Sequence, residues 1–217
     1  MVDSGRVQGN KFLNETAFLT IVSAVFVAEL TDKDALLLLT LATRMKARFV
    51  FAAGSVAFTI TTAIIVTCGY FLVDLVPVSW LKIAGGMIMI TYGVWAFLTS
   101  EKASEKDERE LEAEEDRLLA RSKGKATWLA FFSVVSMLAL LDLSGDATEI
   151  LTFVLVAHFQ NALMVFAGAL IALIAASAFE TFLGGQLRKV ISLRRIRVLS
   201  FVVFLLVGSF VIITTII

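Results

Sequence analysis

Six long apolar segments run through the chain, and they limit it to structures that a lipid bilayer can hold. A helix needs about 20 consecutive apolar residues to cross a bilayer. The segments that qualify are residues 17–43, 49–75, 78–99, 126–157, 161–185 and 196–217. The 217 residues are 59% apolar, compared with about 45–50% in an average soluble domain. Because spanning structures must satisfy every backbone hydrogen bond internally, we predict an all-α membrane protein with six transmembrane helices.

Basic residues fall almost entirely on one side of the predicted bilayer. The segments after the first, third and fifth spans contain three, seven and five Lys or Arg residues. The opposite side has Arg6, Lys11 and Lys82, while Lys33 lies inside the first span. Since cytoplasmic loops carry the excess of basic residues, we expect both termini to be extracytoplasmic. A start without a signal-peptide pattern and the short length favour a multi-pass protein of a prokaryotic plasma membrane.

The chain divides into two similar halves. We predict an extracytoplasmic tail (1–16), a first repeat of three spans (17–100), a charged cytoplasmic linker (101–125) and a second repeat of three spans (126–217). The linker, with nine acidic and seven basic residues, is expected to be a solvated hinge, and a helical extension between Arg109 and Arg121 stays open. Three spans are an odd number, so the two repeats must be inverted. Inverted repeats are typical of secondary transporters, whose substrate site lies near the midplane.

Six carboxylates, three in the first span of each repeat, lie where an ionisable group is costly. The first cluster contains Glu29, Thr31, Asp32, Lys33 and Asp34, and the second contains Asp142, Ser144, Gly145, Asp146, Thr148 and Glu149. An ionisable group at membrane depth costs at least about 2.5–3.5 kcal/mol, so such groups are expected to be functional. On a continuous helix Glu29 and Asp32 would share one face. The same spacing would align Asp142, Asp146 and Glu149.

Carboxylate oxygens are hard ligands, which suit Ca²⁺, Mn²⁺ or Mg²⁺ rather than soft metals. The single Cys and the single His argue against thiolate or imidazole-rich sites. Spans 1 and 4 are expected to be interrupted near the midplane, where freed backbone carbonyls would add ligands. Six carboxylates facing only Lys33 cannot all be charged in a poorly solvated site, so some should hold protons when the cation is absent. Competition between cation and protons would couple their movements.

Other readings of these acids stay open. The clusters could form structural ion pairs, although only Lys33 lies nearby. On an ideal helix Asp34 would point away from the face that carries Glu29. We expect it to support the metal ligands or to cap a helix. Glu180, outside both clusters, is expected to pair with Arg188 near the cytoplasmic surface. Three span hydroxyls are expected to bond helix carbonyls or to pack, namely Thr59, Thr62 and Ser177.

The first cluster resembles the motif of a known transporter family. Golgi-type calcium/manganese:proton antiporters, within the lysine-exporter superfamily, carry Glu-x-Gly-Asp-Lys/Arg-Ser/Thr in each half. Glu29, Asp32 and Lys33 match this motif, whereas Thr31 replaces the Gly and Asp34 replaces the Ser/Thr. In the second cluster Gly145, Asp146 and Thr148 match, Ala147 replaces the base, and Asp142 takes the role of the Glu from one position away.

The resemblance implies export of Mn²⁺ or Ca²⁺ from the cytoplasm in exchange for protons, with both motif segments forming one ion site. The expected metal ligands are Glu29, Asp32, Asp142, Asp146 and Glu149. Supporting or proton-coupling roles are expected for Lys33, Asp34, Thr31, Ser144, Gly145 and Thr148. The expected partners are the bilayer, the cation and protons; we expect no prosthetic group and no nucleic acid, and a homo-oligomer stays open.

Alternative functions come from the same superfamily or from other classes. An exporter of cadmium, of a tellurium-resistance-type substrate or of a basic amino acid would share the fold. An amino-acid exporter should also offer cationic groups for a carboxylate, and only Lys33 is available. An intramembrane aspartic protease usually needs two converging acids without four more beside them, and a scaffold would not require buried acids in both repeats, so no enzyme is expected.

Overall fold

The computed structural model is helical throughout the residues that it describes. These are residues 4–30, 33–98, 127–143, 147–187 and 193–216, with residues 109, 113, 116, 117 and 120 of the linker. The helices are α1 (Ser4–Leu30), α2 (Lys33–Arg44), α3 (Ala47–Leu75), α4 (Val78–Leu98), α6 (Thr127–Asp142), α7 (Ala147–Phe159), α8 (Ala162–Leu187) and α9 (Leu193–Ile216). The five described residues of the linker are all helical, which agrees with the helical alternative for that segment.

These helices account for the six predicted spans. The first span is divided into α1 and α2, and the fourth into α6 and α7, so both predicted interruptions are confirmed. Helix α1 begins at Ser4, ahead of the predicted span, because apolar length detects only the part of a helix that lipid can cover. Within the described ranges, three uninterrupted stretches are long and apolar enough to cross a membrane: Ala47–Leu75, Val78–Trp95 and Ala162–Phe182.

Local sequence signals set the turns between spans. Val76 is extended (φ −126°, ψ 137°) and ends α3, because a residue before proline is disfavoured in the helical region. The carbonyl of Pro77 then accepts the amide of Trp80 (2.9 Å) in the first turn of α4. At the start of α8, the side chain of Asn161 accepts the amide of Met164 (3.0 Å), which is the usual bond of a helix N-cap.

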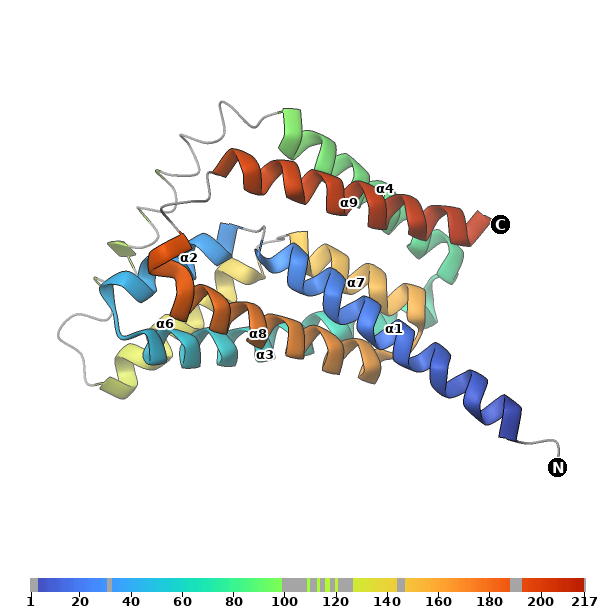
Figure 1. The fold of residues 1–217 in the computed structure, drawn as a ribbon, viewed down its shortest axis with the longest axis horizontal. Coiled ribbons are helices and arrows are strands. Elements are labelled where there is room, and N and C mark those ends of the chain that lie inside the picture. The colour runs from blue at the N-terminus through green and yellow to red at the C-terminus, as the bar shows by residue number, and fades with distance from the viewer. Residues whose placement is uncertain are drawn as a thin grey trace.

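The two repeats interlock, because each broken helix packs on the second span of the other repeat. Helices α1 and α2 contact α8, while α6 and α7 contact α3. Helices α1 and α7 run side by side in opposite directions, and both chain ends lie at the same end of the molecule (Figure 1). The protein thus has six membrane-spanning helices arranged as two inverted three-helix repeats. Exposed leucines such as Leu75 and Leu163 cover the outside, as expected of a surface that meets lipid.

Helices α4 and α9, the third span of each repeat, pack against each other along one face of the molecule (Figure 1). Phe97 and Phe201 stack with their ring centroids 4.9 Å apart. At Gly86 and Gly208 the two backbones approach so closely that a Cβ built on Gly208 would lie 2.8 Å from the carbonyl oxygen of Gly86. Small residues permit this close packing in lipid. The pair contacts the remaining helices mainly through α7.

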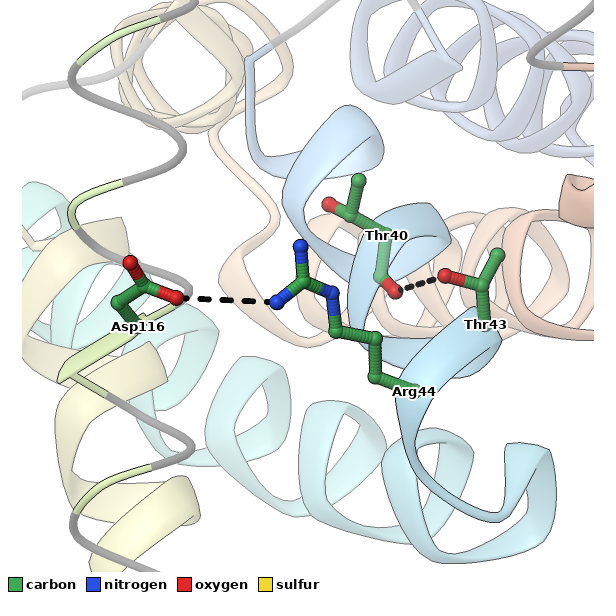
Figure 2. Close-up of polar contacts among 4 residues, drawn as sticks. All are labelled: Thr40, Thr43, Arg44 and Asp116. Atoms are coloured by element: carbon green, nitrogen blue, oxygen red, sulfur yellow. Dashed lines mark hydrogen bonds and ion pairs between the residues drawn. The ribbon is translucent and has the colours of Figure 1, made fainter.

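The linker contacts the end of the first broken span. Arg44, the last residue of α2, forms an ion pair with Asp116 of the linker at 3.7 Å (Figure 2). One residue earlier, the hydroxyl of Thr43 donates to the carbonyl oxygen of Thr40 (2.7 Å). Both ionic side chains are more than half exposed, so the pair is worth at most about 1 kcal/mol.

Candidate ion site at the two helix breaks

Each predicted acidic cluster lies where a spanning helix is broken. Helix α1 ends at Leu30 and α2 begins at Lys33, whereas α6 ends at Asp142 and α7 begins at Ala147. The expected alignment of acids on one continuous helix face includes Asp32 and Asp146, which lie outside the described residues. The described acids lie in different helices, so the fold rather than the sequence spacing decides which of them converge.

Glu29 and Asp142 occupy matching positions in the two repeats and are both buried. Glu29 is the penultimate residue of α1 and is 2% exposed, and Asp142 is the last residue of α6 and is 6% exposed. Each carboxylate lies at the carboxyl end of its helix, where the helix dipole is negative. A carboxylate in this position is destabilised by burial and by the dipole, and a bound cation or proton would relieve both effects.

The two breaks come together in the fold. Figure 1 shows the end of α1 next to the beginning of α7, and these two helices contact each other. In transporters built from broken helices, the carboxyl ends of half-helices and their freed carbonyls typically coordinate cations. Two such ends, each with a buried acid, make this region attractive to a cation.

Asp142 has a partner that the sequence did not reveal. The hydroxyl of Thr61, in the middle of α3, donates a short hydrogen bond to Oδ2 of Asp142. Thr61 is 1% exposed. The only sequence signal was a group of threonines within an apolar span, namely Thr59, Thr61 and Thr62. Thr59 donates to the carbonyl oxygen of Ser55 (2.6 Å), so the expectation that it bonds its own helix is confirmed.

Thr148 lies near the depth of Thr61. One face of α3 packs closely on α7. A Cβ built on Gly69 of α3 would lie only 3.2 Å from Cγ1 of Val156 in α7. The two helices run in the same direction (Figure 1). Thr61 and Thr148 each lie eight residues earlier in their helix, which is about 12 Å at about 1.5 Å per residue. Thr148 is 4% exposed, so its hydroxyl is a further buried polar group at the level of Asp142.

Glu149, in the first turn of α7, faces a different environment. It lines an apolar groove of about 540 Å³ between α3, α4 and α7, together with Cys68 and Leu143 among others. Glu149 is only partly buried. At the amino end of α7 the helix dipole favours a carboxylate, in contrast to the carboxyl ends that hold Glu29 and Asp142.

The other predicted site residues lie outside the described part of the chain. Thr31, Asp32, Ser144, Gly145 and Asp146 are not described, nor are the side chains of Lys33 and Asp34. Among the described residues, no three His, Cys, Asp or Glu side chains gather closely enough to hold a metal ion. Of the five expected ligands, the structure therefore places Glu29, Asp142 and Glu149.

Glu180 is 3% exposed within α8. It was expected to pair with Arg188 near the cytoplasmic surface, and Arg188 lies outside the described residues. Helix α8 is enclosed by α1, α2 and α3, and this lateral packing buries the side chain. One turn earlier, Ser177 is fully buried and its hydroxyl has no hydrogen-bond partner, so of its two expected roles, bonding a helix carbonyl or packing, it has the second.

A family model matches the chain in two stretches, one in each repeat. No curated protein and no solved structure matches the chain significantly. The family model described as "Divalent cation/proton antiporter GDT1" matches residues 17–104 and 130–216. The two matched stretches cover both repeats, and each includes one broken helix with its buried acid. The chain therefore belongs to the GDT1 family of divalent cation/proton antiporters.

Proposed function

We propose that this protein exports Mn²⁺ or Ca²⁺ from the cytoplasm in exchange for protons, at one ion site formed by the two helix breaks. The observation that carries the proposal is the matched pair of buried acids, Glu29 and Asp142, at the carboxyl ends of α1 and α6. Oxygen ligands of this kind favour hard divalent cations. Membership of the family supports exchange with protons.

The proposed ligand set is completed by residues that flank the breaks. Asp32 and Asp146 would join Glu29 and Asp142, and Glu149 would add negative charge from the first turn of α7. Thr31, Lys33, Asp34, Ser144, Gly145 and Thr148 would support these ligands or couple protons to them. Hard oxygen chemistry alone does not separate Mn²⁺ from Ca²⁺, so the assay below includes both ions.

Proton coupling follows from the electrostatics of the two helix ends. Without a cation, Glu29 and Asp142 are buried at negative helix termini, where charged carboxylates are costly. Protonation removes that cost, and so does a bound divalent cation. Because protonation and cation binding exclude each other at these carboxylates, cation binding would release protons and protonation would release the cation.

The proposed orientation rests on charge. The loops after the first, third and fifth spans contain most of the Lys and Arg residues, and basic loops favour the cytoplasm. The linker (101–125) would then be cytoplasmic, while the tail (1–16) and both termini would be extracytoplasmic. Accessibility of cysteines introduced into the linker and the tail, in intact cells and in lysed cells, tests this orientation.

Flux into proteoliposomes tests the function. Purified protein is reconstituted, and uptake of Mn²⁺, Ca²⁺, Mg²⁺ and Cd²⁺ is measured under imposed pH gradients of either sign. We expect Mn²⁺ or Ca²⁺ flux that reverses with the gradient, and loss of that flux in Glu29→Gln and Asp142→Asn. Glu15→Gln, an exposed acid of α1, is the matched control. Flux that ignores the pH gradient would contradict antiport, and flux of neither Mn²⁺ nor Ca²⁺ would contradict the proposed substrates.

A further inference from the structure

The hydrogen bond from Thr61 to Asp142 joins the two repeats at the proposed ion site. Thr61 belongs to α3 of the first repeat, and Asp142 ends α6 of the second. Both side chains are almost completely buried, with exposures of 1% and 6%. Thr61 lies outside both acidic clusters, 81 residues from its partner. The contact therefore exists only because the fold brings the two repeats together.

The hydroxyl of Thr61 has a choice of acceptors, and the carboxylate is the strongest of them. The carbonyl oxygens of Ala57 and Phe58 each lie 3.2 Å from Oγ1. A hydroxyl has only one hydrogen to donate, and hydrogen bonds to a charged acceptor are roughly twice as strong as neutral ones. Both distances are longer than the range of about 2.5–3.0 Å that is normal for O–H···O hydrogen bonds. The hydrogen is therefore assigned to Asp142.

A hydrogen bond from a neighbouring helix orients the side chain of Asp142 more than it would orient a residue inside a helix. It is the last residue of α6, so no further helical turn surrounds its side chain on one side. The negative end of the helix disfavours the charged form, and a donated hydrogen bond offsets part of that cost. With Oδ2 held by Thr61, this oxygen of the carboxylate is restrained relative to α3.

We propose that Thr61 is a positioning residue of the ion site, which orients the Asp142 carboxylate for the cation across the boundary between the repeats. This inference rests on the proposed function, since it assumes that Asp142 binds the transported ion. Loss of the hydroxyl should weaken cation binding, because the carboxylate must then be ordered when the ion arrives. The maximal rate should change little, since no ligand is lost.

Three variants separate the hydroxyl from the packing around it. Thr61→Val keeps the shape and removes the donor, whereas Thr61→Ser keeps the donor. Thr59→Val, two residues away, is the matched control because its hydroxyl donates to the carbonyl of Ser55 within the same helix. The readouts are the half-saturating Mn²⁺ and Ca²⁺ concentrations and the maximal flux in proteoliposomes, together with the Mn²⁺ affinity of the purified protein without a pH gradient.

We expect Thr61→Val to raise the half-saturating concentration and the Mn²⁺ dissociation constant about tenfold, which corresponds to about 1.4 kcal/mol. The maximal flux should stay within about twofold of wild type, Thr61→Ser should recover most of the affinity, and Thr59→Val should match wild type. The expected loss is larger than for a neutral pair because hydrogen bonds to charged groups contribute more to stability than neutral ones.

Two results overturn the proposal. One is a wild-type affinity in Thr61→Val, and the other is a Thr61→Ser variant that binds as weakly as Thr61→Val, which would assign the effect to the lost methyl group. If Thr61→Val does not fold, Thr61→Ser and Thr61→Ala give the same comparison, because they differ only in the hydroxyl. Absence of any divalent flux in wild type refutes the proposed function instead, while the Mn²⁺ affinities still test Thr61.

Discussion

The close contact between α4 and α9 gives the sharpest prediction about stability. A Cβ added at Gly208 would lie 2.8 Å from the carbonyl oxygen of Gly86 and 2.9 Å from Cγ1 of Ile90. Ordinary van der Waals contact begins at 3.4 Å, so the helices would have to separate by about 0.6 Å, and overpacking of this kind costs about 1–3 kcal/mol. Alanine in a helix recovers about 0.5–1 kcal/mol relative to glycine. We therefore expect Gly208→Ala to lose about 1–2 kcal/mol of unfolding free energy.

A second glycine supplies the control with the opposite sign. A Cβ at Gly54 would lie 3.2 Å from Cδ2 of Leu38, the far end of a flexible side chain, and 3.9 Å from Oγ of Ser177. The helix preference should then decide the outcome, so Gly54→Ala should be as stable as wild type or more stable.

Thermal unfolding in detergent, followed by tryptophan fluorescence and by the monodisperse fraction after heating, measures both variants. A loss of 1 kcal/mol shifts the midpoint of a chain of this size by about 2–4 °C, so Gly208→Ala should unfold about 2–8 °C below wild type. If Gly208→Ala is as stable as Gly54→Ala, the backbones of α4 and α9 do not approach each other as closely as the structure indicates.

Three further predictions concern the ion site, the linker and α8. Glu29→Gln and Asp142→Asn should each lower cation flux by at least about tenfold, the equivalent of about 1.4 kcal/mol, while the size-exclusion profile stays that of wild type; retained flux in either variant would remove that acid from the site. Arg44→Ala should change the unfolding free energy by less than about 1 kcal/mol, because the ion pair with Asp116 is exposed, and high salt should remove any difference that a melting curve detects. Ser177→Ala should keep or slightly raise the melting temperature, since a buried hydroxyl without a hydrogen-bond partner costs about 1–3 kcal/mol; a clear drop would indicate a polar partner, such as an ordered water.

The sequence predicted the spans well because the bilayer itself fixes them. A spanning helix must be about 20 residues long, and Pro77 and the basic loops mark the ends. The breaks in the first and fourth spans could also be predicted, since acids and small polar residues at membrane depth are incompatible with an ordinary lipid-facing helix. Two matched stretches of the family model cover both repeats, as the internal similarity had indicated.

Lateral contacts within the membrane could not be predicted in the same way. In a water-soluble helix the polar face identifies the surface, but in lipid both the outer and the buried faces are apolar. Nothing in the pattern of α3 therefore distinguished Thr61, which faces Asp142, from Thr59, which bonds its own helix. The burial of Glu180 could not be predicted for the same reason, because its depth along α8 can be counted but its enclosure by neighbouring helices cannot.

The inverted repeats are not equivalent at the site, and the difference lies in Thr61. Aligning Ala57 with Ala172, on the small-residue faces of α3 and α8, places Ala176 opposite Thr61. Ala176 is fully buried and has no side-chain donor, so the residue of α8 that corresponds to Thr61 cannot donate such a hydrogen bond. Glu29 also has the longer side chain and lies one residue before the end of its helix. We therefore expect loss of the Thr61 hydroxyl to change the α6 side of the site, which holds Asp142, and to leave the α1 side, which holds Glu29, unchanged.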